Sequence, residues 1–150
     1  MAITNNNPKE TIVRESGKGK FTEEIVIGNH VLTADEPLAN GGNDSGPSPY
    51  DFLLAALGSC TAMTLRAYAD NKQLPLKKVI VKLKHDKIYA EDCIDCENEN
   101  SKIDHIERLI ELQGDLSQEQ RAKLLDIANK CPVHRTLTSK MLITTELVKS

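Results

Sequence analysis

A long apolar segment, residues 52–69, constrains the fold more than any other part of the chain. Its helical start is well marked, because Ser48 suits the N-cap, Pro49 suits the first helical position and Asp51 can answer Ser48 in a capping box. Apolar side chains then cover nearly every face of the predicted helix. A helix that is apolar all round is buried, either at the centre of the fold or in a subunit interface.

The segments around this helix indicate an α+β fold. Strands are predicted before it at 11–13, 21–27 and 30–33, and a loop rich in turn residues covers 37–49. After it, 79–83 alternates like a strand, helices begin at Ser117 and Cys131, and 142–145 reads as a closing strand. Residues 103–112 fit either a helix or a strand period; we favour a strand, because Gly114 and a strong helix start follow. We expect residues 1–9 to be disordered or loosely ordered, and residues 10–150 to form a single domain.

Composition narrows the class of protein. The chain has 150 residues and a net charge of −3, without a basic patch, so nucleic acid is not an expected partner. The first residues lack the basic and apolar regions of a signal peptide, and no apolar run approaches the ~20 residues of a membrane span. Four cysteines without an export signal favour a reducing compartment. We therefore expect a cytoplasmic protein with no membrane partner.

Cys60 lies in the middle of the apolar helix, where the simplest interpretation is a small buried side chain. Burial makes a thiol harder to ionise, so a reactive Cys60 needs a nearby cation or hydrogen-bond donor. Arg66 is six residues on, roughly 600° of helical turn, and points away. The activating group would have to come from a distant segment or from another subunit.

Cys131 directly precedes Pro132 and is predicted to lie at a helix N-cap, where the positive end of the helix dipole favours a thiolate. His134 and Arg135 follow one turn later and would add positive character. The alternative is a simple capping residue. From local physics alone, Cys131 is the more acidic of the two candidate thiols.

Cys93 and Cys96 form a C-x-x-C pair in an acidic loop over residues 91–101. A zinc site normally needs four ligands, and a second such pair is missing. The neighbouring carboxylates disfavour a thiolate, which argues against a thioredoxin-like role. We predict an exposed loop and no bound metal or cofactor; the alternative is a metal-binding or redox-sensing role for this pair.

Two segments, 46–60 and 131–134, resemble the OsmC/Ohr family, the osmotically inducible and organic hydroperoxide resistance proteins. The Pro49-Tyr50-Asp51 variant and the C-x-x-C loop resemble a less characterised branch of that family. The resemblance implies an OsmC-like α+β fold with antiparallel sheets and a central buried helix. It also implies that two chains intertwine in a homodimer with their central helices at the interface.

The resemblance further implies a thiol-dependent peroxidase that reduces organic hydroperoxides, with hydrogen peroxide as a second candidate substrate. Cys60 would be the peroxidatic thiol and Cys131 its resolving partner, without a cofactor. An external dithiol or a lipoylated protein would then reduce the disulfide.

The sequence departs from the family at the residues expected to tune the peroxidatic thiolate. Tyr50 stands where relatives carry a glutamate, so the available acid is Asp51, whose other role is to cap the helix. The expected early arginine has only Arg14 as a counterpart, while Lys18 and Lys20 lie nearer the expected turn. These departures motivate an alternative function, a non-enzymatic small-molecule-binding module with vestigial thiols.

Overall fold

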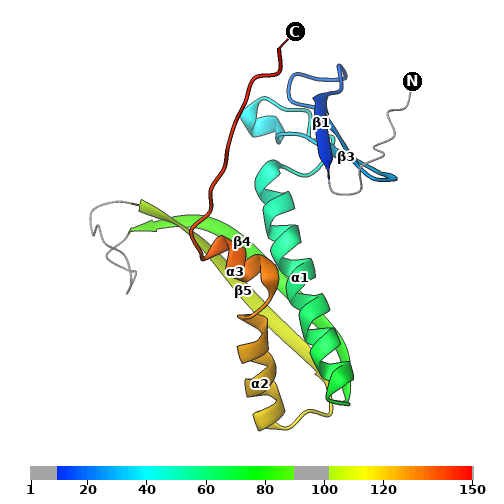
Figure 1. Ribbon diagram of the computed structural model, residues 1–150, viewed down its shortest axis with the longest axis vertical. Coiled ribbons are helices and arrows are strands. Elements are labelled where there is room, and N and C mark those ends of the chain that lie inside the picture. Colours follow the sequence, from blue (N-terminus) through cyan, green and yellow to red (C-terminus); the bar gives the residue numbers. More distant parts are fainter. Residues whose placement is uncertain (1–9, 90–101, 150) are drawn as a thin grey trace. The chain divides into compact units, whose positions relative to one another are not determined.

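The computed structural model describes residues 10–89 and 102–149 (Figure 1). The chain divides into two compact units, one ending at Leu53 and one beginning at Leu54. Each unit is described by itself, and the prediction of a single domain stays a prediction. The expected loose start at 1–9 and the acidic loop with Cys93 and Cys96 lie outside the described residues.

The first unit is an antiparallel three-stranded sheet in the order β1-β2-β3. Its strands are β1 (Thr11–Glu15), β2 (Glu23–Ile27) and β3 (His30–Ala34), which confirms the three predicted strands. Gly28 adopts φ 56°, a conformation that the tight β2–β3 turn needs and that glycine reaches without strain. The loop after β3 contains a short 3₁₀ turn, η1 (Leu38–Asn40).

A buried carboxylate holds that loop. Asp35, 2% exposed, accepts hydrogen bonds from the Thr22 hydroxyl (3.0 Å), the Glu36 N–H (2.8 Å) and the Ser45 N–H (3.2 Å). A carboxylate without contact to water needs such partners, because an unsatisfied acceptor there is destabilising. The polar loop before α1 is therefore an ordered segment.

Helix α1 (Pro49–Asn71) starts where the sequence predicts. The Ser48 N–H donates to the Asp51 carboxylate (2.9 Å) and the Asp51 N–H donates to the Ser48 hydroxyl (3.3 Å), so the predicted reciprocal cap is confirmed. The helix buries one face only: the buried residues are Leu57, Gly58, Thr61, Leu65 and Ala69. On another face Met63 is 70% exposed in the single chain. Within the single chain, α1 is thus buried on one face, and burial of its other faces in a subunit interface stays a prediction.

The length and composition of α1 alone would suffice to cross a membrane, although no such run was expected from the sequence. A core helix passes the same test, and the buried face of α1 packs against strands of the second unit.

Two long antiparallel strands, β4 (Leu76–Tyr89) and β5 (Lys102–Gly114), form the sheet of the second unit. The ambiguous segment 103–112 is therefore a strand, as favoured. Val79 lies opposite Leu112, and Val81 lies opposite Ile110, so these side chains share a face. On that face the absence of a side chain at Gly58 brings α1 close to β4: a Cβ there would lie 2.7 Å from Leu83 Cδ1.

Helices α2 (Gln118–Ala128) and α3 (Pro132–Leu137) follow β5, as predicted. The core of the second unit combines α1, β4, α2 and the β5–α2 connection, with Leu65, Ala69, Leu76, Leu116, Leu124 and Ala128 buried. Partly buried side chains of β5 pack against this cluster. Figure 1 shows α1 running along the β4–β5 sheet. Aliphatic packing between helices and one sheet face therefore organises this unit.

The predicted closing strand at 142–145 is wrong for this chain. Residues 141–149 are extended without strand pairing, and Leu142 and Ile143 are 87% and 78% exposed. A strand needs a neighbour for its backbone N–H and C=O groups, and no described strand pairs with this segment. The residues there have a propensity for strands, but the segment has no neighbouring strand to pair with among the described residues.

The cap of α2 yields a first prediction. Ser117 Oγ accepts from the Gln120 N–H (3.1 Å), and the Gln120 side chain accepts from the Ser117 N–H (2.9 Å). We expect Ser117→Ala to lower the free energy of unfolding by about 1 kcal/mol, measured by urea denaturation. Ser117→Gly is the matched control and should cost only a few tenths. Equal losses in both variants would contradict a capping role.

Candidate functional site

The second unit brings together two thiols that are far apart in the sequence. Cys60 lies on α1, and Cys131 is the N-cap residue of α3. Cys60 lies close enough to Cys131 for its side chain to help lower the pKa of Cys131, and both are free thiols. Cys131 is fully buried, at 0% exposure, whereas Cys60 is half-buried. The fold therefore brings the two thiols into one neighbourhood, with Cys60 as the more accessible of the two.

The surroundings of Cys131 favour its thiolate. Burial raises the pKa of Cys131, but the His134 N–H, the Thr61 hydroxyl, the Cys60 side chain and the charge of Arg108 outweigh it, so that the pKa lies below its ordinary value. The His134 N–H is 3.3 Å and Thr61 Oγ1 is 3.8 Å from the sulfur. Helix α3 has only six residues, so these direct contacts carry the effect that the sequence attributes to a helix dipole.

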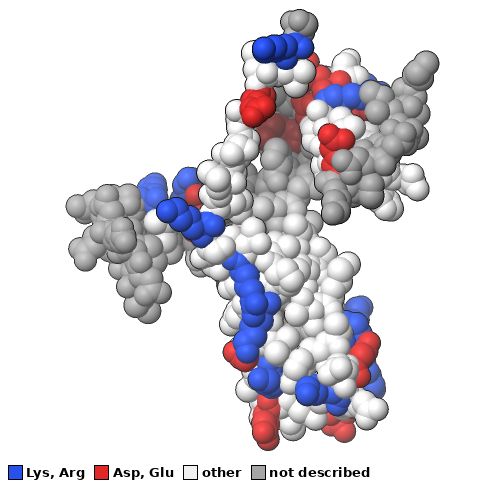
Figure 2. Space-filling view, viewed as in Figure 1, with Lys and Arg blue, Asp and Glu red and all other residues white. Residues whose placement is uncertain are grey.

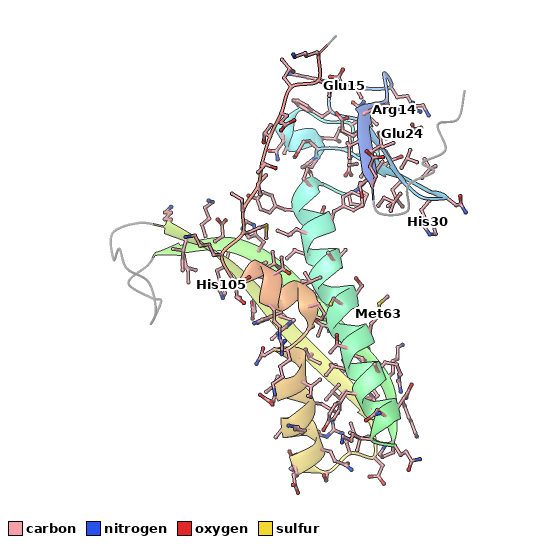
Figure 3. The ribbon with its side chains drawn as sticks, in the orientation of Figure 1. Arg14, Glu15, Glu24, His30, Met63 and His105 are labelled. Carbon is pink, nitrogen blue, oxygen red and sulfur yellow. The ribbon has the colours of Figure 1, made fainter. Side chains whose placement is uncertain are left out.

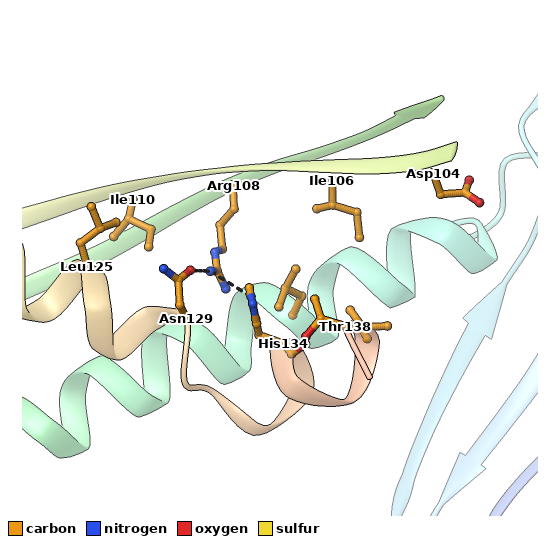
Figure 4. A pocket seen from close by; sticks show the side chains of 10 residues that line it. Asp104, Ile106, Arg108, Ile110, Leu125, Asn129, His134 and Thr138 are labelled. Atoms are coloured by element: carbon orange, nitrogen blue, oxygen red, sulfur yellow. Dashed lines mark hydrogen bonds between the residues drawn. The ribbon is translucent and has the colours of Figure 1, made fainter. Parts of the chain in front are cut away.

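Arg108 of β5 is the residue that the sequence analysis did not identify. It donates to Thr61 Oγ1 (3.0 Å), Asn129 Oδ1 (2.9 Å) and His134 Nδ1 (3.2 Å); Figure 4 shows the last two bonds. Arg108 therefore links α1, α3 and the C-terminal end of α2. The signal that marks it is strand alternation, because Arg108 stands between Ile106 and Ile110 on the face of β5 that packs inward.

His134 contributes a backbone donor rather than a charge. Burial lowers the pKa of His134, and the neighbouring Arg108 charge lowers it further. Because an arginine can only donate, His134 Nδ1 must accept and the ring is neutral. Arg135 is exposed. The positive character expected from these two residues is thus supplied by Arg108 instead.

A cavity of about 430 Å³ adjoins this network (Figure 4). Its walls are half aliphatic and half polar, and the polar groups come from β5 and from α2 and α3 or their C-terminal ends. The lining residues are Leu57, Asp104, Ile106, Arg108, Ile110, Leu125, Asn129, His134, Leu137 and Thr138. The cavity has the size and mixed lining of a small-molecule site.

The remaining candidate tuning residues lie in the first unit. Arg14 pairs with Glu24 across β1 and β2, with Nε 2.6 Å from the carboxylate (Figure 3). Lys20 lies over the Phe21 ring, 4.9 Å from its centroid, and the Lys18 N–H donates to Ser16. Asp51 completes the helix cap. These contacts all lie within that unit, and the tuning roles of these residues stay predictions.

The β4–β5 sheet also carries two histidine–carboxylate pairs. His85 Nε2 lies 2.8 Å from Asp104, and His105 Nδ1 lies 2.8 Å from Asp86. The hydrogen bond from His85 lowers the pKa of Asp104, with a further contribution from Lys87. Within residues 10–89 and 102–149, no group of three or more His, Cys, Asp or Glu side chains gathers as a metal site. Figure 2 shows basic and acidic side chains interspersed at the lower end of the second unit as it is viewed there.

Comparisons with known proteins agree with this fold. A family model described as OsmC-like protein matches residues 41–146. Among solved structures, a putative osmotic stress induced and detoxification response protein of Psychrobacter arcticus 273-4 is 17% identical, with a TM-score of 0.66 over 91% of both chains. An OsmC-like protein of Mycoplasma pneumoniae is 16% identical, with a TM-score of 0.66 over 89% of both. The organic hydroperoxide resistance protein OhrB of Bacillus subtilis is 16% identical, with a TM-score of 0.58 over 86% of this chain and 89% of that one. No curated protein matches.

The match over most of the chain shows that this protein belongs to the OsmC-like family, which confirms the predicted resemblance. The mixed α+β fold with antiparallel sheets is likewise confirmed. At these identities the solved structures speak for the fold alone.

Proposed function

We propose that this protein is a thiol-dependent peroxidase that reduces organic hydroperoxides through Cys60 and Cys131. The observation that carries the proposal is the proximity of a half-buried Cys60 to a buried Cys131 whose environment favours the thiolate. Hydrogen peroxide is a second candidate substrate. Family membership adds support, because proteins with solved structures of similar fold are named organic hydroperoxide resistance proteins.

The reaction begins with attack of the Cys60 thiolate on one oxygen of the O–O bond. That bond breaks, the terminal oxygen stays on sulfur with its hydrogen so that Cys60 becomes a sulfenic acid, and the alkoxide leaves and takes a proton from water to become the alcohol. The Cys131 thiolate then attacks the Cys60 sulfur, a disulfide forms, and the departing hydroxide takes a proton to become water. An external dithiol or a lipoylated protein returns the two electrons and restores both thiols. The cycle needs no cofactor.

Burial supports this division of labour between the thiols. Cys131, at 0% exposure, is shielded from a peroxide arriving from solvent, whereas Cys60 is partly open. A buried thiolate held beside Cys60 suits an intramolecular second step, because proximity replaces a collision. The accessible thiol thus takes the oxidant and the buried one resolves it.

The second candidate function is a small-molecule-binding module with unused thiols. The cavity of about 430 Å³ beside Arg108 favours it, because a lining of aliphatic and polar side chains together suits a small organic ligand with both kinds of group. Such a module would bind without oxidising Cys60. The two functions therefore differ in what a peroxide does to the cysteines.

We also propose that two chains form a homodimer in the cytoplasm. The exposed face of α1 supports this, because Ala55, Ser59, Met63 and Ala67 recur every four residues and all are exposed in the single chain. A stripe of small and apolar side chains at that spacing suits close packing against a second helix.

Mass spectrometry after one equivalent of cumene hydroperoxide tests the peroxidase proposal. We expect a non-reduced digest to contain a Cys60–Cys131 disulfide in most molecules. Cys131→Ser should lack this crosslink and carry a sulfenic acid at Cys60 that dimedone traps. Unmodified Cys60 after this treatment would contradict the proposal and favour the binding module, and a Cys93–Cys96 crosslink alone would favour the redox-sensing alternative.

A further inference from the structure

Arg108 reaches Cys131 by two routes. Its Nη1 donates to Thr61 Oγ1 (3.0 Å), which lies 3.8 Å from Cys131 Sγ. Its Nη2 donates to His134 Nδ1 (3.2 Å), and the backbone N–H of that histidine donates to the same sulfur (3.3 Å). Arg108 is half-buried among α1, α2 and α3. A single guanidinium therefore holds Thr61 and His134, two residues that contact the buried thiol.

The Thr61 hydroxyl has one proton and two possible acceptors. It lies 2.7 Å from the Leu57 carbonyl and 3.8 Å from Cys131 Sγ. With a neutral thiol, the hydroxyl donates to the carbonyl and the S–H can donate to Thr61. With a thiolate, the hydroxyl must turn to the sulfur, because the thiolate only accepts. Arg108 donates to Thr61 Oγ1 in both arrangements and makes that hydroxyl a stronger donor by polarising it.

We propose that Arg108 is a positioning residue that holds Thr61 and His134 so that their O–H and N–H groups stabilise the Cys131 thiolate for the resolving step. The proposal rests on the proposed function for its role in the peroxide cycle, but not for its effect on the thiol. In that step the thiolate forms the S–S bond and hydroxide leaves Cys60, while Arg108 neither gains nor loses a proton. The proposed effect on the Cys131 thiolate does not involve Arg14, the arginine of the early strands.

The charged and titratable groups around Cys131 come from three elements. They are Cys60 on α1, His134 on α3 and Arg108 on β5. Helix α2 ends in the neutral Asn129, which anchors the guanidinium. On the same sheet face, Asp104 of β5 is engaged by His85 and Lys87 of β4. Arg108 is thus the cation whose removal should change the ionisation of Cys131.

The test is a thiolate titration followed by absorbance at 240 nm in a protein whose other three cysteines are serine. Arg108→Gln should raise the midpoint for Cys131 by about one pH unit, about tenfold less thiolate at a given pH. Arg108→Lys should recover part of the shift, since it keeps the charge but loses the fork that bonds three partners. Arg135 is an exposed arginine of α3, the helix that Cys131 caps. Arg135→Gln is therefore the matched control and should leave the midpoint of Cys131 unchanged.

If Arg108→Gln does not fold, Thr61→Val in the protein with Cys131 as its one cysteine tests the contact from Arg108 through Thr61 to Cys131. It should also raise the midpoint of Cys131. An unchanged midpoint in a folded Arg108→Gln or Thr61→Val protein would overturn the proposal, as would an equal shift in Arg135→Gln. Because this titration uses no peroxide, its outcome is independent of whether Cys60 reduces peroxides. In the complete protein, Arg108→Gln should also move the pH profile of Cys60–Cys131 disulfide formation to higher pH.

Discussion

Replacing Cys60 with serine is expected to lower the rate of peroxide reduction by about a thousandfold or more. A serine hydroxyl is not ionised at neutral pH and forms no sulfenic acid, and Cys131 is too deeply buried to take over the first step. Consumption of cumene hydroperoxide with dithiothreitol as the reductant measures this loss. Unchanged turnover in Cys60→Ser would contradict the proposed mechanism.

Cys131→Ser should behave differently, because only the resolving thiol is lost. One equivalent of peroxide should react with each chain at a rate near that of the unchanged protein, and the sulfenic acid should then persist. The double variant Cys93→Ser/Cys96→Ser is the control for the other thiols and should keep full turnover. Loss of turnover in that double variant would favour the alternative redox role for the C-x-x-C pair.

Truncating Leu65 or Leu124 to alanine is expected to lower the free energy of unfolding by about 2–5 kcal/mol. Both side chains are 0% exposed in the core between α1, α2 and the sheet, so each truncation removes apolar contacts and leaves a cavity. Urea denaturation followed by far-ultraviolet circular dichroism measures the change.

Leu125 provides the matched control, because it is the next residue on α2 and is 59% exposed. Leu125→Ala should cost well under half as much as Leu124→Ala. Similar losses at both positions would mean that the core is not arranged as described. The comparison separates burial from helix propensity, since both changes replace leucine by alanine in one helix.

The starts of the helices could be predicted from the sequence because capping is local. Ser48 with Asp51, and Ser117 with Gln120, each satisfy one another's backbone N–H groups within a single turn. Cys131 likewise accepts from a backbone group three residues on. No distant part of the chain is needed for these contacts, so their residue types are sufficient evidence.

Strand assignments depended more on the rest of the fold. Residues 103–112 fit two periods, and pairing with β4 makes them a strand. Residues 142–145 have equally suitable side chains, yet they find no partner among the described strands. Propensity is the same kind of evidence in both cases, and a hydrogen-bonding neighbour makes the difference.

Arg108 shows the same limit at the candidate site. Its position between Ile106 and Ile110 becomes informative only once the segment is known to be a strand, because only then do the three share a face. The cations that the sequence suggests lie near each thiol along the chain or in the early strands. The cation beside Cys131 instead comes from β5, through contacts that exist only when β5 packs against α1 and α3.

For the thiol pair, the sequence by itself determined the family, the long apolar helix that carries Cys60 and the N-cap position of Cys131. These follow from motifs and from contacts between residues a few positions apart. Only the tertiary structure decided that Cys60 and Cys131 are neighbours, that Cys131 is the buried thiol and that Arg108 bonds to Thr61 beside it. The burial and the charge at a site depend on side chains from segments that are distant in the sequence. These side chains come together only when the helices pack on the sheet.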